Sequence, residues 1–224
     1  MSDARAKAVT LYVDAVCPFS YMVATAVAAT ADGMAAVVRW YAVPLAGCGH
    51  GASTADAAMH AARCDAAWPA VVELARSFGL ALRRRPPWLV DSRPFATLCA
   101  RLGDAPPIVL ERLFLGAFDA YFGDGADIGD PRVLASVARA AGVDGTLARV
   151  TDLEATAAAE AAVAAAAARR ITAVPALVVD EHLIMGAQPL QVIRGLLAHP
   201  TPRGPGADGA VSLEGPTLPS PEVR

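Results

Sequence analysis

One cysteine stands at the point where a predicted strand ends and a predicted helix begins. Cys17 follows an apolar run that closes at Val13, and Pro18 occupies the place of a first helical residue, where a missing N–H group costs nothing. The thiol would lie at the helix N-cap, beside free backbone N–H groups and the positive end of the helix dipole. Such surroundings can lower a cysteine pKa from about 8.5 to between roughly 3.5 and 7.5. The pattern predicts a reactive thiolate at Cys17 rather than a cysteine that merely precedes a helix.

The elements around Cys17 form a β-α-β unit. A strand ending at Val13, a helix over Phe19–Ala31 and a strand over Val37–Val43 succeed one another within a short stretch, so a parallel, right-handed crossover is expected. The chain then becomes almost wholly helical, and the longer helices are expected over Ala55–Cys64, Ala67–Gly79, Ile108–Phe122 and Leu153–Arg170.

Strands return only at Ala176–Val179 and Leu183–Met185, before a last helix over Leu190–Ala198. The order β-α-β, helical block, β-β-α is that of an α/β thioredoxin fold with a large α-helical insertion. We expect a discontinuous thioredoxin-fold domain made of residues 8–45 and 171–199, with an α-helical insertion domain over 46–170. The Pro- and Gly-rich segment 200–224 is expected to be a disordered tail.

Three segments together resemble the DsbA superfamily. They are D-A-V-C-P-F-S-Y at Asp14–Tyr21, A-Y-F-G-D-G-A-D-I-G-D-P-R-V-L at Ala120–Leu134, and I-T-A-V-P-A-L-V-V-D…M-G-A-Q-P at Ile171–Pro189. The resemblance is to the FrnE-like branch and to the related 2-hydroxychromene-2-carboxylate isomerases and kappa-class glutathione transferases. It implies that Pro175 is a cis-proline facing the active-site thiol. It also implies that Val174 offers its backbone groups to an extended substrate.

Ser20 departs from the dithiol pattern. Dithiol members of the superfamily carry C-x-x-C, whereas this chain has C-P-F-S, so the motif lacks a resolving thiol. Isomerase and transferase members resemble S-P-Y-S, with serine where Cys17 stands. Cys17 could therefore act alone as a thioltransferase. It could instead attack an electrophile directly or assist a glutathione-like thiol in isomerisation or conjugation, with Ser20 hydrogen-bonded to the sulfur. A third hypothesis is that the protein is a non-catalytic binding module.

The predicted site thus has Cys17, Ser20 and Pro175 as catalytic residues. The substrate-binding residues would be Pro18, Phe19, Val174 and Trp88. Three further cysteines, Cys48, Cys64 and Cys99, could each act as a distant resolving thiol, and Cys48 is preferred because its segment is rich in glycine. No tightly bound cofactor is expected, and glutathione or another low-molecular-weight thiol would serve as co-substrate.

A metal site is a less favoured alternative. Cys48, His50, His60 and Cys64 form C-x-H…H-x-x-x-C, whose ligand types suit zinc, but the superfamily pattern has no such site and we predict none. The run Arg83–Arg85 could bind an anion near the site, although such a run is more often a solvated surface.

Charge and hydropathy limit the partners. The formal net charge is −3, so no basic field would attract nucleic acid or an anionic membrane. No run of 18 apolar residues is free of charge, and the N-terminal residues lack a hydrophobic signal core, so a cytoplasmic location is expected. The expected partners are a small-molecule thiol or disulfide, or an extended peptide. The sequence leaves the oligomeric state open, a homodimer included.

Overall fold

The structure of the protein is a computed structural model that describes residues 8–31, 36–44, 54–82, 86, 90–103 and 105–198. Within these residues one four-stranded sheet has the strand order β2-β1-β3-β4. The strands are β1 (Ala8–Val13), β2 (Val37–Ala42), β3 (Ala176–Val179) and β4 (His182–Met185). β1 is parallel to β2 and antiparallel to β3, and β3 is antiparallel to β4. The predicted α/β fold is therefore confirmed.

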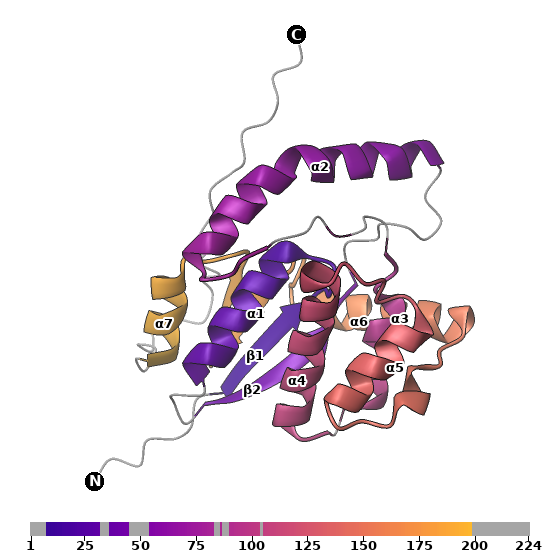
Figure 1. The fold of residues 1–224 in the computed structure, drawn as a ribbon. Coiled ribbons are helices and arrows are strands. Elements are labelled where there is room, and N and C mark those ends of the chain that lie inside the picture. Colours follow the sequence, from indigo (N-terminus) through magenta and orange to yellow (C-terminus); the bar gives the residue numbers. More distant parts are fainter. Residues whose placement is uncertain are drawn as a thin grey trace.

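Two helices complete the β-α-β and β-β-α halves: α1 (Pro18–Ala31) follows β1, and α7 (Leu190–Ala198) follows β4. They lie beside each other against the sheet (Figure 1). The other helical elements all come between β2 and β3 in the chain, which confirms the predicted helical insertion. They are α2 (Thr54–Ser77), α3 (Arg93–Arg101), α4 (Pro107–Phe118), the π-helix η1 (Asp119–Gly123), α5 (Pro131–Ala140), the 3-10 helix η2 (Gly145–Ala148) and α6 (Asp152–Ala168). The domain boundaries at 45/46 and 170/171 stay a prediction.

The alternation of side chains along β1 divides the core in two. Leu11 and Val13 belong to the main cluster, which also contains buried residues of α1, α4 and α7. Tyr12 points to the opposite face and belongs to a smaller cluster with Ala166 of α6. The main cluster joins the insertion to the sheet, because Trp40 of β2 stacks on Phe114 of α4 with ring centroids 5.3 Å apart.

The insertion holds two differences from the sequence-based expectation. The helices predicted over 55–64 and 67–79 are one helix, α2, with Pro69 inside it. Proline removes one hydrogen bond from a helix interior, and the helix accommodates it by bending, which Figure 1 shows for α2. The helix predicted over 108–122 ends at Phe118, after which residues 119–123 wind as a π-helix.

Several segments carry predictions that fall outside the described residues. They include Trp88, the segment with Cys48 and His50, the run Arg83–Arg85, and the tail 200–224. Among the described helices, none is both long enough and apolar enough to cross a membrane.

Candidate active site

The turn between β1 and α1 holds Cys17 at the start of the helix. The Cys17 amide donates to the Asp14 carbonyl at 3.0 Å, and the Val16 amide donates to the Asp14 carboxylate at 3.3 Å. The carbonyl of Cys17 in turn accepts the Tyr21 amide at 3.1 Å, which is the bond of a first helical turn. Cys17 therefore occupies the N-cap, with Pro18 as the first residue of α1.

Ser20 lies beneath the thiol and is fully buried. Its hydroxyl accepts a hydrogen bond from the Asp14 amide at 3.3 Å. The same hydroxyl is hydrogen-bonded to the Cys17 sulfur. A hydroxyl group can accept one hydrogen bond while donating its proton to another group. Ser20 thus links the turn backbone to the sulfur, which agrees with the hydrogen bond expected between Ser20 and the sulfur.

The pKa of Cys17 departs from the expectation. Cys17 is only partly exposed, and burial of its thiol raises the pKa above the ordinary cysteine value. Hydrogen bonds from Ser20 and from the Phe19 amide lower the pKa, while the Asp14 charge raises it. The lowered pKa predicted from the sequence is wrong. The helix end does stabilise a thiolate, but removal of that charge from water outweighs it.

The chain before β3 lies across from the thiol. The peptide bond between Val174 and Pro175 is cis. The Cys17 thiol donates to the Val174 carbonyl with Sγ and O 3.9 Å apart, although the two residues are 157 positions apart in the sequence. Pro175 is buried, and its carbonyl accepts the Gly186 amide at 2.8 Å, which fixes this segment to the end of β4. The structure therefore brings Cys17, Ser20, Val174 and Pro175 into one site.

The fold that holds these residues has counterparts among known proteins. The family described as "DSBA-like thioredoxin domain" matches residues 8–198 of the chain. The chain belongs to this family. No curated protein matches it in sequence.

Solved structures share the DSBA-like fold. A "probable DsbA oxidoreductase" from Streptomyces coelicolor is 21% identical, with 96% of this chain and 100% of that chain covered at a TM-score of 0.69. A 2-hydroxychromene-2-carboxylate isomerase is 20% identical, with 85% and 94% covered at a TM-score of 0.63. The cytosolic disulfide reductase DsbM from Pseudomonas aeruginosa is 15% identical, with 85% and 97% covered at a TM-score of 0.60. At these identities the likeness shows the fold alone.

One contact of this DSBA-like site was not foreseen from the sequence. The Tyr21 hydroxyl, one helical turn beyond Cys17, donates to the Asp119 carboxylate at 2.6 Å. The Tyr21 ring also stacks on Phe118 and Phe122, with centroids 5.3 and 5.5 Å away. These contacts join the thiol-bearing turn to the π-helix of the insertion. The sequence signal was the apolar and aromatic stripe within residues 110–122. It predicted a core helix, but it did not indicate that Tyr21 would contact this segment.

The remaining candidate residues divide between those the structure places and those it does not. Pro18 and Phe19 are both partly exposed beside Cys17, where a substrate could touch them. Cys99 is buried, and burial raises its pKa well above the ordinary value, so it is poorly placed to attack a disulfide. His60 and Cys64 share a face of α2, with Nε2 and Sγ 3.2 Å apart. The described residues hold no group of three or more potential metal ligands.

Proposed function

We propose that the protein is a thiol–disulfide oxidoreductase of the thioltransferase type that uses Cys17 as its single nucleophile. The observation that carries the proposal is the position of the Cys17 sulfur, 3.9 Å from the Val174 carbonyl and partly open to solvent. Ser20, which stands where dithiol relatives carry the resolving cysteine, gives the sulfur a hydrogen bond in place of a second thiol.

The reaction takes two balanced exchange steps. Cys17 attacks a mixed disulfide R–S–S–R′, forming a Cys17–S–S–R bond while R′ leaves as a thiolate and takes up the proton that Cys17 gives up. A low-molecular-weight thiol such as glutathione then attacks this bond, releases Cys17 as the thiol, and departs as a disulfide with R. No internal disulfide is needed, which suits a C-P-F-S motif.

The raised pKa of Cys17 shapes the first step. At neutral pH the resting group is the thiol, hydrogen-bonded to the Val174 carbonyl. A substrate that takes over this carbonyl with its own N–H group would free the sulfur to attack. Main-chain recognition of this kind suits an extended peptide or a glutathione-like backbone. Pro18 and Phe19 would contact the substrate from the helix side, and we also propose this role for Trp88.

The location and assembly belong to the same proposal. We propose that the reaction takes place in the cytoplasm, the compartment named for the Pseudomonas disulfide reductase that shares the fold. The protein would work without a bound metal or a tightly bound cofactor. Either a monomer or a homodimer could carry out a reaction that uses one thiol.

The second candidate is a glutathione-dependent isomerase or transferase acting on an aromatic or polyketide-like small molecule. Two observations favour it: Ser20 matches the serine that isomerase and transferase members resemble at this place, and the isomerase structure shares the fold at a TM-score of 0.63. In this reaction Cys17 or Ser20 would hold the sulfur of the bound thiol rather than attack a disulfide.

The deciding experiment measures glutathione-dependent reduction of a small mixed disulfide by the wild type, Cys17→Ser and Cys64→Ser. We expect Cys17→Ser to abolish the activity and Cys64→Ser, at a partly buried thiol on α2, to leave it unchanged. Intact-mass analysis should find a glutathione adduct on the wild type and none on Cys17→Ser. Full activity in Cys17→Ser would refute the proposal.

A gain-of-function variant tests the role of Ser20. Ser20→Cys restores C-P-F-C, and we expect insulin reduction by the variant to exceed the wild type by about tenfold or more, because a local disulfide can then form. An unchanged rate in Ser20→Cys, together with conversion of a hydroxychromene carboxylate by the wild type and glutathione, would instead favour the isomerase.

A further inference from the structure

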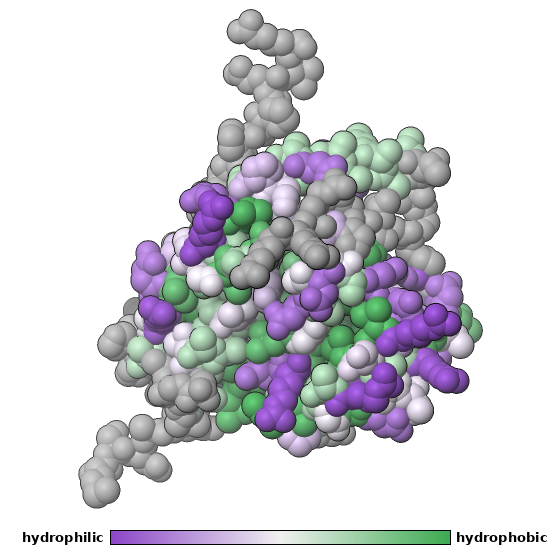
Figure 2. Space-filling model, viewed as in Figure 1, coloured by the Kyte–Doolittle hydropathy of each residue, from purple (hydrophilic) through white to green (hydrophobic). Residues whose placement is uncertain are grey.

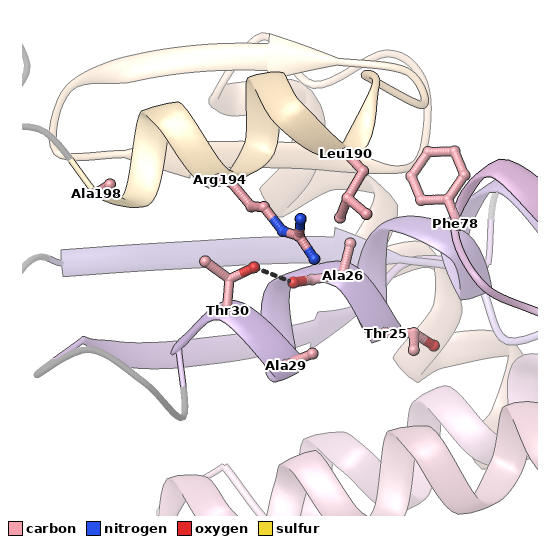
Figure 3. A pocket seen from close by; sticks show the side chains of 8 residues that line it. All are labelled: Thr25, Ala26, Ala29, Thr30, Phe78, Leu190, Arg194 and Ala198. Carbon is pink, nitrogen blue, oxygen red and sulfur yellow. Dashed lines mark hydrogen bonds between the residues drawn. The ribbon is translucent and has the colours of Figure 1, made fainter.

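Helices α1 and α7 border a pocket of about 280 Å³. Figure 3 shows its walls: Ala26, Ala29 and Thr30 come from α1, Leu190 and Arg194 from α7, and Phe78 from the chain just after α2. The pocket lies 8 to 13 residues along α1 from Cys17, which is about 12 to 20 Å at the rise of an α-helix. It is therefore separate from the thiol site.

The walls are mostly hydrocarbon. Methyl groups of alanine and threonine, the Leu190 side chain and the Phe78 ring line most of the surface, and none of the lining residues is acidic. The whole of α1 is free of charged residues, so its wall offers no carboxylate either. An apolar cavity with one or a few polar groups is the usual form of a small-molecule site, and about 300 Å³ is the lower end of the common range.

Arg194 is the single cation among the lining residues. In Figure 3 its side chain extends from α7 toward α1 and ends near Ala26, and the residue is exposed to solvent at the mouth of the pocket. Within the described part of the chain it makes neither an ion pair nor a side-chain hydrogen bond. A guanidinium presents paired N–H donors that fit the two oxygens of one carboxylate.

The other polar groups of the pocket set a limit on the ligand. The Thr30 hydroxyl donates to the Ala26 carbonyl at 2.7 Å, so its proton is already used within α1, whereas the buried hydroxyl of Thr25, another lining residue, has no hydrogen-bond partner within the described residues. Arg194 is left as the only charged donor, which suits a ligand with one carboxylate and not a polyanion. The hydrocarbon walls suit an apolar remainder.

We propose that this pocket, defined by α1, α7 and Arg194, binds an apolar monocarboxylate. The carboxylate pairs with Arg194, and the hydrocarbon portion lies against Ala26, Ala29 and Phe78. The site is independent of the chemistry at Cys17, and its occupation is a binding activity additional to the proposed thiol exchange.

The test titrates the full-length protein with octanoate and, in parallel, with octanamide, which has the same hydrocarbon chain and no charge. Binding is followed by amide chemical shifts of residues in α1 and α7. For a ligand of this size we expect a dissociation constant of about 1 mM for octanoate and binding at least about tenfold weaker for octanamide.

Two variants and one control locate the site. Arg194→Gln should weaken octanoate binding about tenfold or more and remove the difference between octanoate and octanamide. Ala29→Leu, at an exposed position on the pocket wall, should weaken both ligands because it fills the space. Arg132→Gln, an exposed arginine on α5, should change nothing. Equal binding of the acid and the amide, or octanoate binding that survives Arg194→Gln, would overturn the proposal.

A further readout separates this proposal from the proposed function. Disulfide exchange should proceed at the same rate in Arg194→Gln as in the wild type, and octanoate should bind Cys17→Ser as tightly as the wild type. Absence of any shift at about 10 mM octanoate in the wild type would also refute the pocket while leaving the thiol chemistry untouched.

Discussion

The two ends of α1 are built in opposite ways. At the N-terminal end, the polar groups of Asp14, Cys17 and Ser20 are close together and hydrogen-bonded to one another. At the C-terminal end, small side chains leave a pocket whose one cation comes from another helix. Helix α1, which contains no charged residue, thus forms the thiol site with its own first turn. It contributes to the pocket because its small side chains leave space beside α7. The first depends on hydrogen bonds, and the second depends on volume and one charge.

The largest expected contrast between the two ends is in their response to pH. Because the pKa of Cys17 is raised, little thiolate is present at neutral pH, and the rate of alkylation by iodoacetamide should rise about tenfold per pH unit up to at least pH 9. Octanoate binding should stay flat from about pH 6 to 9, since arginine and carboxylate both keep their charge there. Mass-resolved alkylation of the wild type measures the first, and titration at each pH measures the second. An alkylation rate already constant above about pH 7 would show a low-pKa thiol.

Ser20→Ala should damage the N-terminal end alone. It leaves the Asp14 amide without its buried acceptor and the Cys17 sulfur without its hydroxyl donor. We expect a loss of about 1 to 3 kcal/mol in the free energy of unfolding and a further rise in the pKa of Cys17. Urea unfolding and the alkylation profile measure the two effects. Ser77→Ala, on the exposed end of α2, is the control, and octanoate binding should not change.

Tyr21→Phe should have a smaller effect. It keeps the ring stacked on Phe118 and Phe122 but removes the 2.6 Å hydrogen bond to Asp119, in a partly exposed place. We expect a loss of about 1 kcal/mol in urea unfolding. The pKa of Tyr21 is raised, first by burial and then by Asp119, so the neutral hydroxyl is the stabilising form. The difference between Tyr21→Phe and wild type should therefore be constant across neutral pH and shrink from about pH 10 upward, where the tyrosine ionises in the unfolded state while the raised pKa keeps the folded-state hydroxyl neutral.

Thr30→Val should have the smallest effect. The Thr30 hydroxyl donates to a carbonyl of its own helix, and its loss buries no unpaired group. We expect the free energy of unfolding to change by no more than about 0.5 kcal/mol. Octanoate should bind with unchanged affinity, because the carboxylate is held by Arg194. A large loss in either measurement would mean that the pocket end depends on hydrogen bonds as the thiol end does.

Local sequence patterns predicted much of the fold. The start of α1 at Pro18 and the extent of α7 over Leu190–Ala198 were predicted from proline placement and helical periodicity, and both are confirmed. The strand predicted over Val37–Val43 matches β2, which ends one residue earlier. These elements depend on residues near in sequence, which is why short patterns suffice for them.

The features that could not be predicted from the sequence depend on residues far apart in the chain, or on physical effects that act in opposite directions. The helical pattern indicated two helices over residues 55–64 and 67–79, yet α2 runs through both ranges as one helix that contains Pro69. The partner of Tyr21 lies 98 positions away. The helix end and the burial of Cys17 act on its pKa in opposite directions, and only the folded surroundings decide which prevails. The pocket of Arg194 needs the relative placement of two helices far apart in the chain.

The π-helix over residues 119–123 has a consequence for the evolution of the insertion. A π-turn accommodates one residue more than an α-turn, so such segments behave as single-residue insertions in an otherwise regular helix. Deletion of one residue here would remove the turn that the Asp124 amide closes by donating to the Asp119 carbonyl, and would shorten the connection from α4 to α5 by one residue. The stacking of Phe122 on Phe118 and its edge contact with Tyr121 both depend on the present winding. The length of this segment is therefore constrained even where its residue types can vary, and insertions and deletions should be far rarer here than substitutions.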